Sequence, residues 1–182
     1  ILWFNNEEQS QKVAIRCYQA LFGITTAELF ANIDTYKQKY RELVGDRIQI
    51  FDLEDSSNTK RIETIIQSTN PSLIIIDQLD KVRGFKADRH DLQMKYLYQW
   101  AREIAKTSAP VIAVCQAGGS AEGKAWLDLN DVDSSKTAKQ GEADWMLGIG
   151  AEADAMSNSR YLKINKNKLI GDKDTRAELR HG

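Results

Sequence analysis

The sequence is poor in the residues that build metal sites and covalent cross-links. It contains two cysteines and two histidines in 182 residues. Cys17 and Cys115 lie far apart with no CxxC pair, which favours reduced thiols in a cytosolic protein over a disulfide framework. His90 and His181 have no partner ligands at metal-binding spacing, so we treat both as ordinary side chains.

Long apolar runs and a strong excess of one charge are also lacking. No apolar run approaches the length of a membrane span, so we expect no membrane partner. The formal net charge of −1 argues against a protein coated with basic patches, but it is compatible with a few lysines and arginines in a channel. The length suits one domain with a sizeable core. Residues 1–4 resemble a strand rather than a signal peptide, and we expect the chain to begin inside a larger domain.

One stretch, residues 70–80, organises the rest of the chain. Residues 73–76 are four consecutive apolar side chains, too few for a helix, and they predict a central strand buried on both faces. The strand ends on Asp77, at the edge where open α/β sheets bind ligands. In nucleotide hydrolases an Asp in this position holds Mg²⁺. The alternative is a strand-end Asp that caps the next turn.

Strands and helices alternate along the remainder. Further strands are predicted at residues 1–4, 48–51, 111–115, 145–149 and 161–164. Helices are predicted from a Ser10 cap to Phe22, from a Thr25–Glu28 capping box to Gly45, and over residues 59–68 and 91–107. This order predicts an α/β fold, with a mostly parallel sheet flanked by helices and a C-terminal hairpin.

Three polar side chains stand at the ends of three predicted strands: Glu7, Asp77 and Gln116. In a doubly wound sheet these ends lie along one edge. An acid that holds metal, an acid that activates water and an amide that senses a phosphate would form a set for phosphoryl transfer. Strand ends also carry polar residues simply because loops begin there, and the spacing alone does not decide between the two readings.

Four segments resemble successive motifs of a single family. They are Phe4-Asn5-Asn6-Glu7-Glu8, the Ile-Ile-Ile-Asp strand, Pro-Val-Ile-Ala-Val-Cys-Gln and Gln-Gly-Glu-Ala-Asp-Trp-Met-Leu. In order and rough separation they are similar to the RecA-like motor domain of hexameric replicative helicases, the DnaB type and the phage primase-helicases, from residue 1 to about 171. The resemblance implies a single RecA-like ATPase core domain over residues 1–182, truncated on its N-terminal side.

The resemblance implies roles for individual residues. Glu7 would deprotonate the attacking water, with Glu8 as a less favoured substitute. Asp77 would hold Mg²⁺, through water, on ATP or another nucleoside triphosphate. Gln116 would couple the γ-phosphate to a DNA-binding loop.

A basic residue that reaches the phosphates from the neighbouring subunit is also implied. The matching turn, residues 166–172, offers Lys168 with Lys166 beside it, where the family usually has an Arg. Because Lys is a point charge without a planar fork, it would stabilise the transition state less well. The alternative is that both lysines lie at a solvated hairpin tip.

The family's glycine-rich phosphate loop has no counterpart in the sequence. Residues 118–125 match G-x-x-x-x-G-K, but Ala125 replaces the Ser or Thr that should reach Mg²⁺, and the segment follows Asp77 instead of preceding it. We therefore reject it as a phosphate loop, and we expect the isolated chain to be inactive.

Residues 117–141 are predicted to be a long mobile loop that faces the channel of a ring. Lys124, Lys136 and Lys139 could contact single-strand phosphates there, and Arg83 and Lys86 could do so from the loop at residues 81–89. That second loop could equally be an exposed basic connection.

The leading hypothesis is an ATP-driven 5′–3′ DNA helicase motor. Its expected partners are single-stranded DNA, further copies in a hexameric ring, and a primase or polymerase, in the cytoplasm of a bacterium or a phage-infected host cell. One alternative is a RecA-type recombinase or clock-type ATPase, since the fold does not determine the function. The other is a degenerate RecA-like module that binds DNA or a partner and hydrolyses nothing.

Overall fold

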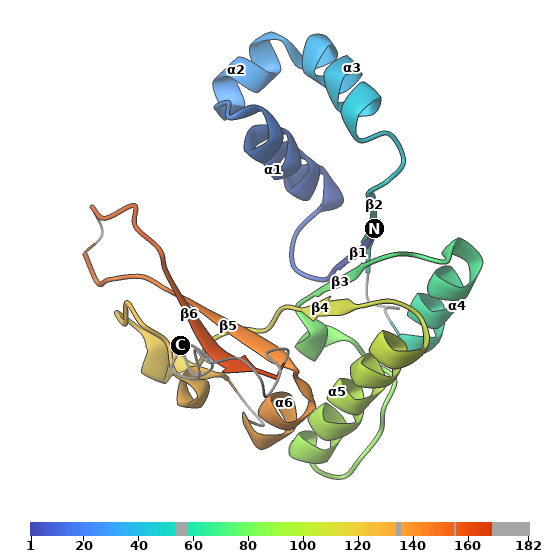
Figure 1. Cartoon of the computed structure of the whole chain (residues 1–182), viewed down its shortest axis with the longest axis vertical. Coiled ribbons are helices and arrows are strands. Elements are labelled where there is room, and N and C mark those ends of the chain that lie inside the picture. The colour runs from blue at the N-terminus through green and yellow to red at the C-terminus, as the bar shows by residue number, and fades with distance from the viewer. Residues whose placement is uncertain (54–57, 134–135, 155, 169–182) are drawn as a thin grey trace, which may run out of the picture. The chain divides into compact units, whose positions relative to one another are not determined.

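The computed structural model describes residues 1–53, 58–133, 136–154 and 156–168 (Figure 1). The chain forms two compact units. The first contains Ile1–Gly84 and Ile104–Val114, and the second contains Phe85–Glu103 and Cys115–Gly182. None of the described helices combines the length and apolar character needed to cross a lipid bilayer.

The first unit is built on a four-stranded parallel sheet. Its strands are β1 (Leu2–Asn5), β2 (Gln49–Asp52), β3 (Ile74–Asp77) and β4 (Val111–Ala113), in the order β2-β1-β3-β4 (Figure 1). This confirms the predicted α/β class and the internal position of the Asp77 strand. Together with flanking helices, the sheet is consistent with a RecA-like layout.

One face of this sheet carries the apolar core. Leu2 and Phe4 of β1 pair in register with Ile74 and Ile76 of β3, and all four side chains are buried. The opposite face is less covered, since Ile75 is only half-buried, so the prediction that β3 is buried on both faces is wrong.

The predicted buried strand over residues 111–115 is also corrected. It is shorter, ending at Ala113, and Ile112 is 50% exposed. The physical reason is position, because β4 lies at the end of the described strand order and pairs only with β3.

The helices of the first unit follow the predicted signals with two corrections. Helix α1 (Ser10–Phe22) ends at Gly23, which adopts the left-handed conformation expected of a C-terminal glycine. Ser10 is its first residue rather than its cap, which is Gln9. The Thr25–Glu28 capping box opens α2 (Thr26–Ala31) as predicted.

The single long helix expected from Thr25 to Gly45 is wrong. Asn32, at φ −135°, ends α2 and α3 (Ile33–Leu43) begins after it. Asn competes with the helical backbone through its own side chain, so it is a natural place for the break. Helix α4 (Thr59–Thr69) matches its prediction to within one residue and buries Ile62 and Ile66. A short 3₁₀ turn, η1 (Leu79–Lys81), follows β3.

The second unit holds the antiparallel strand pair β5 (Trp145–Gly150) and β6 (Tyr161–Asn167), which confirms the predicted C-terminal strands. Helix α5 (His90–Thr107) begins in this unit, and its last turn belongs to the first. Because β6 extends to Asn167, Lys166 lies in a strand and not in the predicted turn. Residues 169–172 of that turn lie outside the described part.

Residues 117–141 are not the irregular loop that was predicted. They contain the 3₁₀ turns η2 (Gly119–Ala121) and η3 (Leu129–Asp131) and most of helix α6 (Lys136–Glu142). The segment lies close against β5, since a Cβ added at Gly150 would collide with the carbonyl oxygens of Lys124 and Ala125. Low hydrophobic periodicity concealed this order because polar contacts hold the segment in place.

Candidate active site

A row of polar side chains crosses the carboxyl edge of the first unit's sheet. Asn5 of β1 pairs with Asp52 of β2 on one side and with Asp77 of β3 on the other. The loop that carries Glu7 and Glu8 leaves β1 from this row. Since the strands are parallel, all three ends point the same way, as open α/β ligand sites require.

Glu7 follows the end of β1, whose last residue, Asn5, pairs in register with Asp77, and the charge of Glu7 acts on Asp77. Asp77 is half-buried, and its pKa is raised first by burial and next by the negative charge of Glu7, with a smaller contribution from Glu8. The backbone N–H of Gln78 and the charge of Arg16 act in the opposite direction. The ionised Asp77 is therefore short of positive charge, which is the environment that a bound cation would complete.

The two glutamates differ in how free they are. Glu7 is exposed, and its carboxylate makes no hydrogen bond or ion pair with the described residues. Glu8 is half-buried and ion-paired with Arg16 of α1, with 2.5 Å between Glu8 Oε2 and Arg16 Nη1. Since a general base must be free to accept a proton, this difference favours Glu7 over Glu8.

Gln116 belongs to the second unit. Its side chain is exposed, and its carbonyl oxygen accepts a hydrogen bond from the backbone N–H of Asp133 at 3.1 Å. Glu7 and Asp77 belong to the first unit, so the convergence of Gln116 with them stays a prediction.

The acidic side chains at this edge suit a magnesium ion that is held mainly by water and substrate phosphates. No group of three or more His, Cys, Asp or Glu side chains suited to a metal occurs in the described ranges. Mg²⁺ usually keeps several waters and needs only one or two carboxylates in addition to substrate phosphates. Asp77, with its uncompensated charge, fits that role.

The two candidate lysines of the second unit lie close together but differ in freedom. Lys166 Nζ donates to the carbonyl oxygen of Gln140, and its pKa is lowered first by burial and then by the charge of Lys168. Lys168 has a half-exposed side chain whose Nζ lies 4.0 Å from Asp144 Oδ1. Lys168 is therefore the better placed of the two to reach another molecule.

The predicted DNA contacts divide into available and unavailable side chains. Arg83 and Lys86 are exposed. Lys139 is only 1% exposed and its Nζ lies 5.5 Å from the centre of the Tyr98 ring, which corrects the expectation of an exposed lysine there. Lys136 opens α6, but its side chain lies outside the described part.

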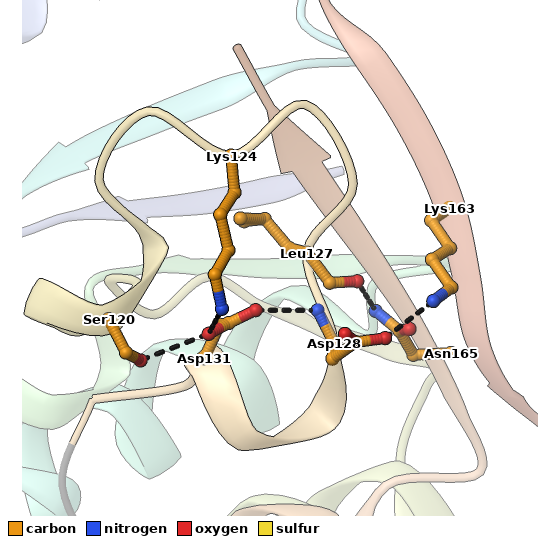
Figure 2. A network of polar contacts seen from close by, with 7 residues as sticks. All are labelled: Ser120, Lys124, Leu127, Asp128, Asp131, Lys163 and Asn165. Carbon is orange, nitrogen blue, oxygen red and sulfur yellow. Dashed lines mark hydrogen bonds and ion pairs between the residues drawn. The ribbon is translucent and has the colours of Figure 1, made fainter. Parts of the chain in front are cut away.

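Lys124 takes part in a polar network in the second unit (Figure 2). At its centre, Asp131 is 2% exposed and accepts hydrogen bonds from Lys124 Nζ and the Asp128 backbone N–H at 2.8 Å, and from Ser120 Oγ at 3.0 Å. The Asp128 backbone hydrogen bond, followed by that of Lys124, lowers the pKa of Asp131 to about 2. Lys163 of β6 in turn pairs with the Asp128 carboxylate at 2.5 Å.

This network agrees with the rejection of residues 118–125 as a phosphate loop. The ammonium of Lys124 is bound to a buried carboxylate, and the next regular element is the 3₁₀ turn η3, with no α-helix whose amino end could hold phosphate. A nearby pocket of the second unit, lined mostly by small residues, also carries Glu122 and Glu152. Its acidic side chains do not suit a phosphate backbone.

The network predicts acid-sensitive stability. Because the folded pKa of Asp131 is depressed from 3.8 to about 2, its contribution is present above pH 4 and is lost as the pH falls through that window. We expect Asp131→Asn to lower the melting temperature at pH 7 by several degrees and to lose that difference near pH 2. Thermal melts of both proteins from pH 2 to 7 measure it. A constant difference over this range would contradict the role of the charge.

No protein-family model matches the chain, and no curated protein is similar enough to be identified as its relative. The assignment of a function therefore depends on the residues themselves.

Three side chains of these two sites were not singled out from the sequence. Asn5 and Arg16 surround the acidic loop, and Asp131 organises the second unit's network. For Asn5 a signal existed, since it is the first polar residue after the strand predicted at residues 1–4. For Asp131 the Asp-x-x-Asp spacing of a capping box was present. Nothing in the local sequence indicates that Arg16 reaches Glu8.

Proposed function

We propose that this chain is the motor domain of a ring-shaped replicative DNA helicase, which couples ATP hydrolysis to translocation on single-stranded DNA and to duplex unwinding. The observation that carries the proposal is that the half-buried Asp77 and the loop bearing the exposed Glu7 lie at the same carboxyl edge of a parallel sheet, where the charge of Glu7 raises the pKa of Asp77. Nucleotide hydrolases need this combination of a base and a cation-holding acid at one edge.

In the proposed reaction, Glu7 accepts the proton of the water that attacks the γ-phosphate of ATP. Its exposure, with no bonded partner among the residues that the structure describes, leaves its carboxylate free for this step. Asp77 would hold Mg²⁺, which supplies charge neutralisation on the phosphates when bound. Lys168 would act on the nucleotide of a neighbouring subunit, and Gln116 would report the state of the γ-phosphate to the DNA-binding surface. Arg83 and Lys86 remain the proposed DNA contacts, whereas the ammonium of Lys124 is bound to Asp131.

The raised pKa of Asp77 predicts that its ionised carboxylate lowers the free energy of unfolding of the protein. In the unfolded chain Asp77 has a pKa of 3.8, and in the folded protein its pKa is higher. The carboxylate therefore ionises more readily in the unfolded chain, and the folded protein loses stability as the pH rises through the folded pKa. We expect Asp77→Asn to raise the melting temperature at pH 7 by a few degrees, with no gain below pH 3.8. The same variant should lose most Mg²⁺-dependent ATP hydrolysis. A lower melting temperature at pH 7 would show that Asp77 is a structural acid.

The direct test of the proposal uses the full-length protein. We expect ATP hydrolysis that is stimulated by single-stranded DNA and unwinding of a forked duplex in the 5′–3′ direction. Hydrolysis is measured with and without a DNA oligonucleotide, and unwinding by strand release from the fork. Hydrolysis without DNA stimulation would favour another ATPase of the same fold, and DNA binding without hydrolysis would favour a degenerate module.

A further inference from the structure

The loop that carries Glu7 folds around one buried side chain, that of Asn5. Asn5 is the last residue of β1 and is 2% exposed. A buried carboxamide has two donor hydrogens and two acceptor lone pairs to satisfy, and leaving any of them unpaired is costly. The contacts of the Asn5 side chain therefore indicate its structural role.

Both ends of the Asn5 carboxamide are used. Oδ1 accepts the backbone N–H groups of Glu7 at 3.4 Å and Glu8 at 3.5 Å, which are long and individually weak hydrogen bonds. Nδ2 donates to the carbonyl oxygen of Glu8 and to Asp52 Oδ1, the latter at 3.3 Å. Turning the amide over would set Nδ2 against two N–H donors, so the partners determine its orientation.

Asp52 connects this side chain to the start of α1. Burial alone would raise the pKa of Asp52, but hydrogen bonds from the side chain and backbone N–H of Ser10 and from Asn5 together lower it. Asp52 thus accepts a hydrogen bond from Asn5, the last residue of β1, and interacts with Ser10, the first residue of α1. The loop at residues 6–8 is fixed at both ends by one amide–carboxylate pair.

From this arrangement we infer that Asn5 is a positioning residue, which holds the backbone at Glu7 so that the Glu7 carboxylate stands beside Asp77. The inference rests on the proposed hydrolysis. Glu7 has no bonded side-chain partner among the described residues, so the backbone at Glu7 must set where its carboxylate lies. Small displacements of a reacting group are costly, with about 10²-fold lost for roughly 1 Å.

The test is an exchange of the two side chains in the full-length protein. Asn5→Asp places two carboxylates against each other and removes the Nδ2 donor, so turnover should fall by about 10- to 100-fold while ATP affinity changes little. Adding Asp52→Asn restores a donor–acceptor pair between the two positions with the roles reversed, but not the hydrogen bond to the Glu8 carbonyl oxygen, so it should recover part of the lost turnover. Asn58→Ala is the matched control, because it removes a side-chain cap of α4 in the same unit and should lower stability without this effect on turnover.

The outcomes separate this inference from the proposed function. If the wild-type protein does not hydrolyse ATP, both are overturned. If it hydrolyses ATP and Glu7→Gln is as active as wild type, the positioning role of Asn5 is overturned and the proposed function is not. If Glu7→Gln is inactive but Asn5→Asp turns over normally, only the positioning role is overturned. Failure of the exchange variant to recover turnover, with its melting temperature restored, also overturns it. Recovery of turnover at unchanged ATP affinity supports it.

Discussion

Replacing Glu7 with Gln is expected to abolish ATP turnover while leaving ATP binding intact. The substitution keeps the size of the side chain and removes its ability to accept a proton, so hydrolysis should slow by about 10²- to 10⁴-fold, the usual contribution of a general base. Because the Glu7 carboxylate has no ion pair or hydrogen bond in the described structure, the fold should be unaffected. Steady-state hydrolysis and nucleotide-binding titrations of the full-length protein measure the two effects separately.

Glu8→Gln is the matched control for this experiment. It removes one negative charge at the next residue, but the Glu8 carboxylate is ion-paired with Arg16 of α1. We expect it to retain most of the turnover. The reverse result, with Glu8→Gln inactive and Glu7→Gln active, would move the base to Glu8, and equal activity of both variants would remove the base from this loop.

The second large effect is expected at Lys168. Removing a charge that acts on the neighbouring subunit's phosphates should lower turnover by at least about 10²-fold, below the 10³ to 10⁵ attributed to an arginine finger because Lys lacks the planar fork. Lys163→Ala serves as the control in the preceding strand β6, since Lys163 pairs with Asp128 of the second unit's network. That control should alter stability more than turnover.

Mixing two inactive variants tests whether Lys168 acts across subunits. A ring built from equal amounts of Lys168→Ala and Glu7→Gln subunits contains some interfaces with an intact Glu7 on one side and an intact Lys168 on the other. If subunits assemble at random, about a quarter of the interfaces are complete, and hydrolysis should reappear in the mixture. A mixture no more active than its two components would contradict the proposed geometry.

The ends of several elements were predictable because they depend on short-range chemistry. Gly23 ends α1 through a left-handed backbone that costs glycine little, and the Thr25–Glu28 box opens α2 through reciprocal hydrogen bonds. The break at Asn32 and the exposure of Ile112 were not predictable. The position of the helix break depends on which turn of a polar helix lacks packing contacts in the folded unit. The exposure of Ile112 depends on how many strands flank β4.

Of the candidate site, the acids at the sheet edge were predictable, and the contacts and burial of the individual side chains were not. Glu7 and Asp77 were selected because polar groups at parallel strand ends share an edge, and in the structure the charge of Glu7 acts on Asp77. Lys139 was selected as an exposed cation, yet it is buried beside Tyr98. Charge alone could not reveal this, because a lysine can bury its long stem and its ammonium together when an aromatic ring and other groups receive it.

By itself the sequence determined the alternation of strands and helices, the strand that ends on Asp77 and the identity of the acids beside it, since apolar periodicity and capping act over a few residues. Only the tertiary structure decided that Arg16 engages Glu8, that Asn5 contacts both Asp52 and the acidic loop, and that Asp131 binds Ser120, Lys124 and Asp128. These outcomes depend on contacts between groups that are distant along the chain, and such contacts exist only once the sheet and its loops are assembled.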